Sequence, residues 1–232
     1  MYLYETHLHT APVSACAAGS PAAQVRAYKA AGYAGIIVTD HFFNGNSGCP
    51  SDWPWDKKLE FFTSGYRQAE REGRLCGLDV FFGLEYCIRG TEFLTYGLSP
   101  EFLAAHPGMD TLTAAQYSAL VRDGGGYLAQ AHPYRKDWWI ASPFPVDPGL
   151  IDGVEVYNAS MPDAVNAKAR EFARLHGLPA QAGSDSHSIG LPFMSGIGLA
   201  RRAESIGEII DALKAKRAKL IVPEGAECPP IL

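Results

Sequence analysis

Histidine and carboxylate side chains stand directly after strand-like apolar runs at several widely separated places in the sequence. The residues that share this position are His7, His9, His41, Glu85, His132, Asp185 and His187. In parallel α/β folds the carboxyl ends of the strands gather on one face, so these side chains are expected to converge there. Imidazoles and carboxylates without thiolates suit zinc, manganese or iron(II), and ions bridged by a carboxylate suit phosphoryl chemistry. The sequence therefore predicts a metal-dependent hydrolase.

No single histidine would support this prediction, because a lone histidine is far more often a hydrogen-bonded or surface residue than a metal ligand. The set as a whole is more specific than its members. Two of the seven histidines fall outside it, since His106 precedes Pro107 in a loop and His176 ends a helical segment before Gly177. We interpret His106 and His176 as structural or helix-terminal residues, because a histidine near a helix C-terminus interacts favourably with the helix dipole.

The elements that must position these residues alternate between short apolar runs and longer segments of helical period, which is typical of strands joined by crossover helices. Strands are expected at 2–4, 35–39, 79–84, 92–98, 127–131, 153–157, 179–182, 196–200 and 220–222. Helices are expected at 21–31, 56–72, 113–122, 162–176 and 205–217. Ser20 suits the N-cap of the first helix and Pro21 its first position. Closure of about seven of these strands into a parallel barrel wrapped in helices is the simplest arrangement, and an open doubly wound sheet is the alternative.

Composition and charge limit the classes of partner. The 232 residues, 47% of them hydrophobic, suffice for one sizeable core, so we expect a single domain over residues 1–232. A formal charge of -5 argues against broad capture of nucleic acid or an anionic membrane and favours a small substrate. Neither a leader segment nor an apolar run of about 20 residues stands out, so a cytoplasmic protein is expected. The five cysteines are scattered, which predicts reduced thiols.

The motifs extend from Thr6-His7-Leu8-His9-Thr10 to Gly183-Ser184-Asp185-Ser186-His187, with Thr-Asp-His, Gly-x-Glu and Ala-His-Pro in order between them. In this order they resemble the polymerase and histidinol phosphatase (PHP) family of metal-dependent phosphoesterases. The resemblance implies a distorted (β/α)7 barrel that carries two or three divalent metal ions. It also implies a first ion held by His7, His9, Glu85 and Asp185, a second held by the bridging Glu85 with His132, and a third held by His41 with His187.

Two departures from the family pattern concern the second and third ions. Many relatives carry a further His or Asp soon after His-x-His, whereas this chain reads Ala-Pro-Val-Ser-Ala-Cys over residues 11–16, so the third ion lacks an obvious partner. Relatives often carry a histidine where Glu92 stands before the apolar strand that begins at Phe93. A carboxylate at residue 92 can ligate the same ion and would favour a harder metal such as manganese over zinc or iron.

Two further residues are candidates for catalysis. Asp40 has two interpretations that stay open: it orients His41 or assists proton transfer, or it is a loop carboxylate that caps backbone amides. Asn158, at the end of a strand, is similarly ambiguous. Arg135 is the best candidate for a phosphate clamp, because a planar guanidinium can bind two phosphate oxygens at once, and Lys136 is a weaker candidate.

Tryptophans and a long loop are candidates for the walls of the site. Residues 44–55 read as a long loop, and such loops commonly serve as lids or binding walls. The four tryptophans, Trp53, Trp55, Trp138 and Trp139, follow predicted ligands. Each of them either stacks on a sugar or base or lines the pocket, and we expect at least two to be wall residues.

The predicted function is hydrolysis of the phosphoester bond of a small phosphorylated metabolite by metal-activated water. Histidinol phosphate is a specific alternative substrate. Nucleic acid is not expected as a partner, apart from a nucleotide or a short oligonucleotide. The same ligands would also suit a metal-dependent amidohydrolase, because activated water attacks a carbonyl carbon as well. A noncatalytic accessory domain is the alternative outside enzymes, and the nearly complete ligand set argues against it.

Overall fold

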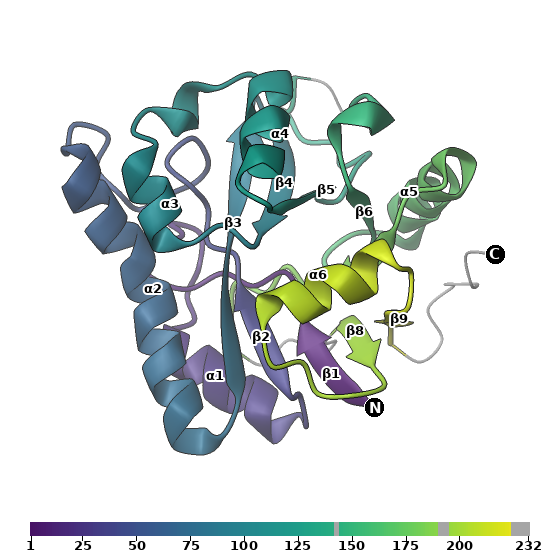
Figure 1. Cartoon of the computed structure of the whole chain (residues 1–232), viewed down its shortest axis with the longest axis horizontal. Coiled ribbons are helices and arrows are strands. Elements are labelled where there is room, and N and C mark those ends of the chain that lie inside the picture. Colours follow the sequence, from purple (N-terminus) through teal and green to yellow (C-terminus); the bar gives the residue numbers. More distant parts are fainter. Residues whose placement is uncertain (142–143, 190–194, 224–232) are drawn as a thin grey trace.

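A single curved sheet forms the centre of the molecule. The computed structural model describes residues 1–141, 144–189 and 195–223. Its strands are β1 (Tyr2–Glu5), β2 (Gly35–Val38), β3 (Asp79–Ile88), β4 (Thr91–Tyr96), β5 (Tyr127–Gln130), β6 (Gly153–Asn158), β7 (Ala180–Gly183), β8 (Gly196–Leu199) and β9 (Lys219–Ile221). They form one nine-stranded sheet in the order β7-β6-β5-β4-β3-β2-β1-β8-β9, which curls into a nearly closed barrel (Figure 1). The predicted distorted barrel is confirmed.

Helices surround this sheet. They are α1 (Pro21–Ala30), α2 (Trp55–Cys76), α3 (Pro100–Ala105), α4 (Ala114–Asp123), α5 (Asp163–His176) and α6 (Ile206–Lys214), with short 3-10 turns at Met109–Thr111 and Pro148–Leu150. Helices α1 and α2 pack side by side, whereas α6 crosses one end of the barrel (Figure 1). As predicted, Ser20 caps α1 by accepting a hydrogen bond from the Ala23 amide, and Pro21 lies in the first turn.

Two strands depart from the parallel arrangement expected from the sequence. β4 runs antiparallel to β3 and β5, and β8 runs antiparallel to β1 and β9. The cause at β4 is the tight turn of Arg89 and Gly90, whose φ angles are 51° and 85°. Two successive residues with positive φ make the kind of turn that joins antiparallel strands directly. The expectation of parallel strands is corrected at β4 and β8, and the pairs from β1 to β3 and from β5 to β7 are parallel.

Two helix assignments also differ from the prediction. Helix α2 was expected to stop at Gly73 but continues to Cys76 and ends at Gly77, which has a φ of 74°. Gly73 lies inside the helix, and its lack of a side chain lets the segment after the helix pack closely against it. A Cβ at residue 73 would lie 2.6 Å from the Leu78 carbonyl oxygen. Helix α3 was not predicted, because its six residues are too short for a clear helical period.

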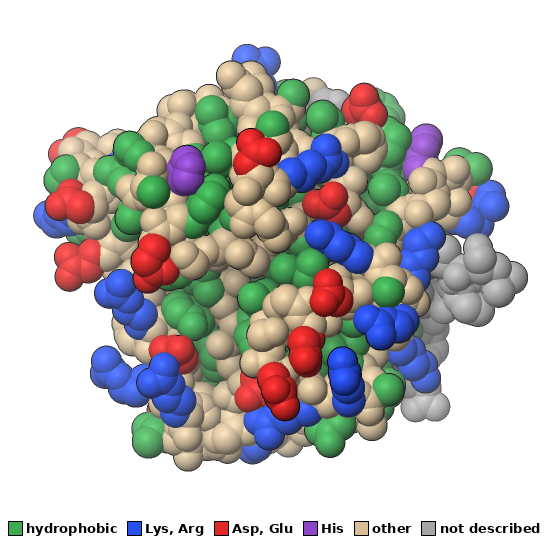
Figure 2. All heavy atoms as spheres, viewed as in Figure 1, with side chains coloured by type: hydrophobic (Ala, Val, Ile, Leu, Met, Phe, Trp, Pro, Cys, Tyr) green, Lys and Arg blue, Asp and Glu red, His purple; other side chains and the backbone are tan. Residues whose placement is uncertain are grey.

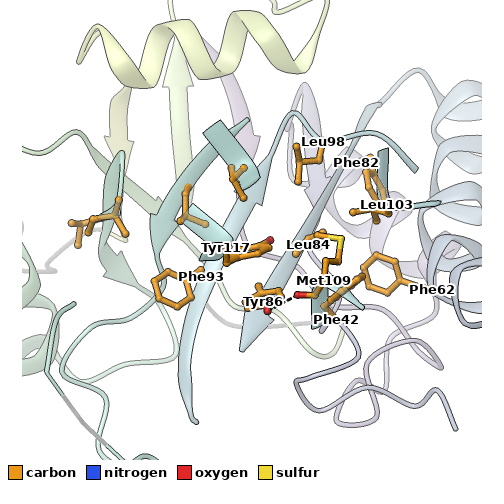
Figure 3. Packing of buried hydrophobic residues seen from close by; sticks show 14 of the residues in the cluster. Phe42, Phe62, Phe82, Leu84, Tyr86, Phe93, Leu98, Leu103, Met109 and Tyr117 are labelled. Atoms are coloured by element: carbon orange, nitrogen blue, oxygen red, sulfur yellow. Dashed lines mark hydrogen bonds between the residues drawn. The ribbon is translucent and has the colours of Figure 1, made fainter. Parts of the chain in front are cut away.

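The outer face of β3 is anchored by an aromatic core. The cluster drawn in Figure 3 includes Phe42, Phe62, Phe82, Leu84, Tyr86, Phe93, Leu98, Leu103, Met109 and Tyr117. The rings of Tyr86 and Tyr117 stack 3.6 Å apart, and the Tyr86 hydroxyl donates a hydrogen bond of 2.6 Å to the Met109 carbonyl. Successive side chains of a strand point to opposite faces. Packing of Leu84 and Tyr86 against the helices therefore directs Glu85 into the barrel.

A second cluster fills the inside of the barrel. Tyr4, Tyr96 and Tyr127 are fully buried there, and Ile209 and Leu213 of α6 join them. The Tyr96 hydroxyl donates to the Thr6 carbonyl at 2.8 Å, which ties this floor to the segment that leaves β1. The polar residues after the strands thus lie above a packed apolar floor.

The surface carries charges of both signs. On the face shown in Figure 2, acidic and basic side chains are interspersed rather than separated. None of the helices in the described ranges is long and apolar enough to cross a bilayer. Cys16, Cys49, Cys76 and Cys87 are free thiols, and Cys228 lies outside the described residues.

Candidate metal centre

The residues predicted as metal ligands come together at one rim of the barrel. Their ligand atoms fall into four overlapping groups, and within each group all atoms lie within 4.8 Å of one another. The groups are His7, Glu85 and His132; His7, His9 and Asp185; His41, Glu85 and Glu92; and His9, His41 and His187. All of these side chains are buried except His187, which is partly exposed. Residues separated by most of the chain thus form one continuous cluster of imidazoles and carboxylates.

Glu85 lies at the centre of the cluster. Its Oε1 is 3.2 Å from His7 Nε2 and 3.3 Å from His132 Nε2. Its Oε2 is 2.8 Å from His41 Nδ1 and 3.3 Å from His9 Nε2. Within the described part of the chain, neither Glu85 oxygen nor His41 Nδ1 makes a hydrogen bond of acceptable geometry. Buried polar atoms without partners are costly, and divalent cations between the carboxylate and the imidazoles would satisfy them together. The donor set therefore fits divalent metal ions.

Asp185 and His132 reach the cluster from the segments that follow β7 and β5. Asp185 Oδ1 is 3.4 Å from both His7 Nε2 and His9 Nε2. The φ angles are 52° for Asp185 and 24° for His132, and such left-handed backbone costs roughly 1–3 kcal/mol at a residue other than glycine. Gly183 allows the close approach of β7, because a Cβ there would lie 2.6 Å from His7 Cβ. The local backbone is therefore shaped around the ligand atoms.

The two departures from the family pattern concern Glu92 and the group of His9, His41 and His187. Glu92 Oε2 is 3.4 Å from His132 Nε2, and its Oε1 is 3.8 Å from His41 Nδ1. The carboxylate thus lies inside the cluster, next to Glu85. Beside His41 and His187, the third neighbour is His9, whose ring centroid is 4.2 Å from that of His187 and 4.3 Å from that of His41. His9 is thus the third member of the group that contains His41 and His187.

Asp40 lies behind the ligands and does not line the cavity described below. Its Oδ1 accepts hydrogen bonds from the Thr10 amide at 2.6 Å and from the Ser14 hydroxyl at 2.8 Å, and its Oδ2 accepts from the Thr10 hydroxyl at 2.6 Å. Ser14 Oγ in turn lies 3.0 Å from His9 Nδ1 and accepts a bond from the His41 amide. Asp40 therefore contacts the ligands through Ser14, and it also caps a backbone amide.

Glu155 is a site residue that the sequence analysis missed. It is fully buried in β6, where its Oε1 lies 2.9 Å from His7 Nδ1 and its Oε2 accepts from the His132 amide at 2.9 Å. Asn158 Nδ2 donates to the same Oε2 at 2.9 Å and to Asp185 Oδ2 at 3.3 Å. One carboxylate and its amide neighbour thus touch His7, His132 and Asp185. The available signal was a charged residue inside the apolar run Val154-Glu155-Val156.

Glu5 was missed for the same reason. Its buried Oε1 accepts hydrogen bonds from the backbone amides of His7 at 2.8 Å and Ser184 at 2.9 Å, and its Oε2 accepts from the Tyr28 hydroxyl at 2.6 Å. Glu5 therefore joins the end of β1, which carries His7, to the end of β7, which leads to Asp185.

A cavity of about 650 Å³ opens directly onto the cluster. Its lining residues are Cys16, His41, Asn46, Glu85, Glu92, Arg135, Trp138, Trp139, Ser160, Met161, Asp185 and His187. The Arg135 Nε donates to Asp137 at 2.6 Å, and its Nη1 lies 3.7 Å from Glu92 Oε2. A volume of this size suits a small-molecule ligand rather than a single inorganic anion.

The predicted wall residues divide into two pairs. Trp138 and Trp139 line the cavity, whereas Trp53 and Trp55 do not. Trp55 packs against Phe43 and donates its indole N–H to the Leu103 carbonyl, and Trp53 packs edge-on against Phe61. The loop of residues 44–54 contributes Asn46 to the cavity, and Lys136 is exposed outside it.

Burial and charge shift the protonation of the cluster. Burial lowers the pKa of His7, but the carboxylates of Asp185, Glu155 and Glu85 raise it by more, so the net pKa is well above the usual 6.5. Burial raises the pKa of Glu85, but the charges of His7 and His41 lower it by more than burial raises it. The pKa of Glu85 therefore lies well below the usual 4.5. These directions predict that the metal-free protein holds His7 doubly protonated at neutral pH, so that metal binding at Nε2 would release one proton.

These shifts predict that the stability of the protein freed of metal by a chelator (the chelated protein) depends on pH. The raised pKa of His7 contributes stability that is fully present below pH 6.5 and is lost as pH rises through the folded-state pKa. The lowered pKa of Glu85 contributes stability that is present above pH 4.5 and is lost at more acid pH. We therefore expect the Tm of the chelated protein to fall between pH 6.5 and 9. Stabilisation by added Mn²⁺ should instead grow over the same range, and a chelated Tm that rises toward pH 9 would contradict these charge assignments.

Comparison with known proteins supports the fold. Residues 164–191 match the model of the PHP-associated family, and no curated protein matches the chain. A two-domain protein from Bacteroides vulgatus that contains a predicted PHP-like metal-dependent phosphoesterase is 17% identical, with a TM-score of 0.70 over 95% of this chain and 64% of its own length. The chain thus spans about two thirds of that protein.

Two other solved structures are similar over most of this chain. An amidohydrolase from Chromobacterium violaceum, with bound sulfate and no metal, is 15% identical with a TM-score of 0.57, and the match covers 97% of this chain and 99% of that one. A lesion-specific endonuclease from Pyrococcus furiosus is 13% identical with a TM-score of 0.54, and the match covers 94% of this chain and 57% of that one. The matches confirm the predicted resemblance at the level of the fold.

Proposed function

From the fold that this chain shares with a PHP-like metal-dependent phosphoesterase, we propose that residues 1–232 form one metallohydrolase domain that cleaves phosphoester bonds of a small phosphorylated metabolite in the cytoplasm. The observation that carries the proposal is the buried Glu85 carboxylate, which lines the cavity, lies within 3.3 Å of four histidine nitrogens and has no hydrogen bond of acceptable geometry among the described residues. A cluster of that composition suits divalent ions, and such ions suit phosphoryl transfer.

The ligand atoms divide among two or three ions. His7, His9, Glu85 and Asp185 would hold the first ion. Glu85 would bridge to a second ion held by His132 and Glu92, and His41 with His187 would hold a third, with His9 beside them. Bound ions would activate water as the nucleophile and neutralise charge on the phosphoryl group. Because Glu92 adds a carboxylate to this set, we propose manganese over zinc or iron for the second ion.

The protein's own residues position these ligands and the substrate. We assign Asp40 the role of holding His9 in place through Ser14, because Ser14 Oγ contacts both side chains. We assign Arg135 the role of a phosphate clamp, because its guanidinium lines the cavity beside Glu92 and Asp137 holds its orientation.

Arg135→Lys tests the clamp. Lysine keeps the charge but loses the planar fork, so we expect KM for a phosphomonoester to rise about tenfold with a smaller change in kcat. Arg202→Lys is the matched control, because Arg202 makes a bidentate ion pair with Asp79 outside the cavity. An unchanged KM in Arg135→Lys would remove Arg135 from the proposed binding site.

Amide hydrolysis is the second candidate function, because a structurally similar protein is an amidohydrolase. The deciding experiment offers the metal-reconstituted protein an aryl phosphate, an alkyl phosphate, histidinol phosphate, a short oligonucleotide and a cyclic amide. We expect hydrolysis of the small phosphomonoesters, lost on chelation and restored by metal. Hydrolysis of the cyclic amide alone would favour the amidohydrolase, and preferential cleavage of the oligonucleotide would contradict a small substrate.

A further inference from the structure

We propose that Trp138 and Trp139 bind a planar ring, so that the substrate is a phosphate ester whose alcohol portion carries such a ring. This inference rests on the proposed function and narrows its substrate class. The ring would lie against the indoles while the phosphate faces Arg135 and the ligand cluster.

The exposure of these two side chains is the first observation. Trp138 is 93% exposed and Trp139 is 47% exposed, although large aromatic residues usually bury most of their surface. Both line the cavity that opens onto the candidate metal centre. Single exposed apolar residues are common, but an adjacent pair at the mouth of such a cavity marks a place where apolar surface is covered on binding.

The arrangement of the rings suits a planar ligand. The two indoles are perpendicular, with an interplanar angle of 90° and centroids 5.5 Å apart. A planar group that stacks on one indole is therefore perpendicular to the other, and both stacked and edge-to-face contacts are favourable for aromatic rings. The Arg135 guanidinium lies 5.4 Å from the centre of the Trp139 ring. Arg135, the proposed phosphate clamp, is thus adjacent to the proposed ring-binding surface.

The turn between β3 and β4 holds the backbone of the segment that carries Trp138 and Trp139, the ring-binding wall. The Ala141 amide donates to the Arg89 carbonyl at 3.1 Å, and the Ile140 amide donates to the Asp137 carbonyl at 3.1 Å. The contact is close, because a Cβ on Gly90 would lie 2.8 Å from Ile140 Cα and 3.0 Å from the Trp139 carbonyl oxygen. Surfaces that are ordered before binding lose less entropy when the ligand arrives.

Charge in the cavity argues for a ring rather than a second phosphate. Among the described lining residues Arg135 is the one permanent cation, and it is already paired with Asp137. Three other lining side chains, Asn46, Ser160 and Met161, are neutral. With a volume of about 650 Å³, the cavity has room beyond the phosphate for a neutral group of ring size.

The test compares adenosine 5′-monophosphate with ribose 5-phosphate, which share the phosphorylated carbon and differ in the ring. For the unmodified protein we expect kcat/KM to be about five- to 100-fold higher for adenosine 5′-monophosphate, the range of base–aromatic stacking. Trp138→Ala and Trp139→Ala should bring this ratio toward one, chiefly through KM. Trp53→Ala, which changes a tryptophan outside the cavity, should keep the ratio of the unmodified protein.

Binding of both compounds to the chelated protein, measured by calorimetry, separates the two proposals. Equal kcat/KM values, or a ratio that survives both tryptophan substitutions, would overturn the ring-binding wall and leave phosphoester hydrolysis standing. If neither compound is hydrolysed, the proposed function is decided by the substrate panel described above, and the ring inference is decided by binding. Tighter binding of adenosine 5′-monophosphate that Trp139→Ala abolishes would support it, and equal binding would overturn it.

Discussion

Glu85→Gln is expected to lower metal-dependent turnover at least about 10³-fold, because bound ions supply several kcal/mol of transition-state stabilisation and each 1.36 kcal/mol is tenfold in rate. Glu85 has contacts of 2.8 to 3.3 Å with four histidine nitrogens, and both of its oxygens lack hydrogen bonds within the described residues. Glutamine keeps the shape but has one oxygen and no charge, so it cannot bridge two cations. Steady-state kinetics with added Mn²⁺ measures the loss.

The matched control is Glu72→Gln on α2, which makes the same chemical change where the carboxylate pairs with Arg26 at the surface. Circular dichroism should show an unchanged fold for both variants, and Glu72→Gln should keep full turnover. Turnover that persists in Glu85→Gln would show that the reaction centre lies elsewhere.

The second large effect is expected for Glu155→Gln, which should weaken metal affinity about 10- to 100-fold, the usual cost of losing a hydrogen-bonding partner behind a metal ligand. The carboxylate accepts from the His132 amide and from Asn158 on one oxygen, and its other oxygen lies 2.9 Å from His7 Nδ1. The glutamine side chain has one oxygen and one NH₂ group. Its NH₂ must therefore face either His7 Nδ1 or the two donors, which are the His132 amide and Asn158 Nδ2. The first orientation moves the proton of His7 to the nitrogen needed for ligation, and the second leaves donors unpaired.

Competition with a chelator of known affinity measures this change independently of turnover. Asp79→Asn is the control, since it removes a carboxylate that pairs with Arg202 away from the site. The visible d–d absorption of bound Co²⁺ should also change in Glu155→Gln and not in Asp79→Asn. Equal metal affinity in Glu155→Gln would reduce Glu155 to a packing role.

Much of the barrel and the predicted ligands could be inferred from the sequence, because the signals are local. A short apolar strand followed by a polar residue marks the rim of an α/β sheet, and His7, His132 and Asp185 all follow such strands. Ser20 and Pro21 likewise marked the start of α1, because capping is decided within a few residues. Glu85 was found for the same reason, although β3 runs on to Ile88 and encloses it.

What could not be predicted depends on contacts between distant segments. The direction of β4 follows from the positive φ of Arg89, which no local preference of arginine indicates. Glu5 and Glu155 read as interruptions of apolar strands, and only the barrel brings them to the ligand-bearing segments of β1, β5 and β7. The sequence also offered four tryptophans of equal standing, and the cavity separates Trp138 and Trp139 from the others.

Metal content and hydrolysis, measured on one preparation, test the central claim most directly. Bound metal is removed from the protein with a chelator, and the protein is reconstituted with Mn²⁺ or Zn²⁺ and freed of excess ion. One part is used for elemental analysis and the other for a phosphomonoester assay. The predicted result is about two or more ions per chain, with hydrolysis that rises in step with metal content. Fewer than about one ion per chain, or hydrolysis that is independent of the bound metal, would contradict a metal centre built on Glu85.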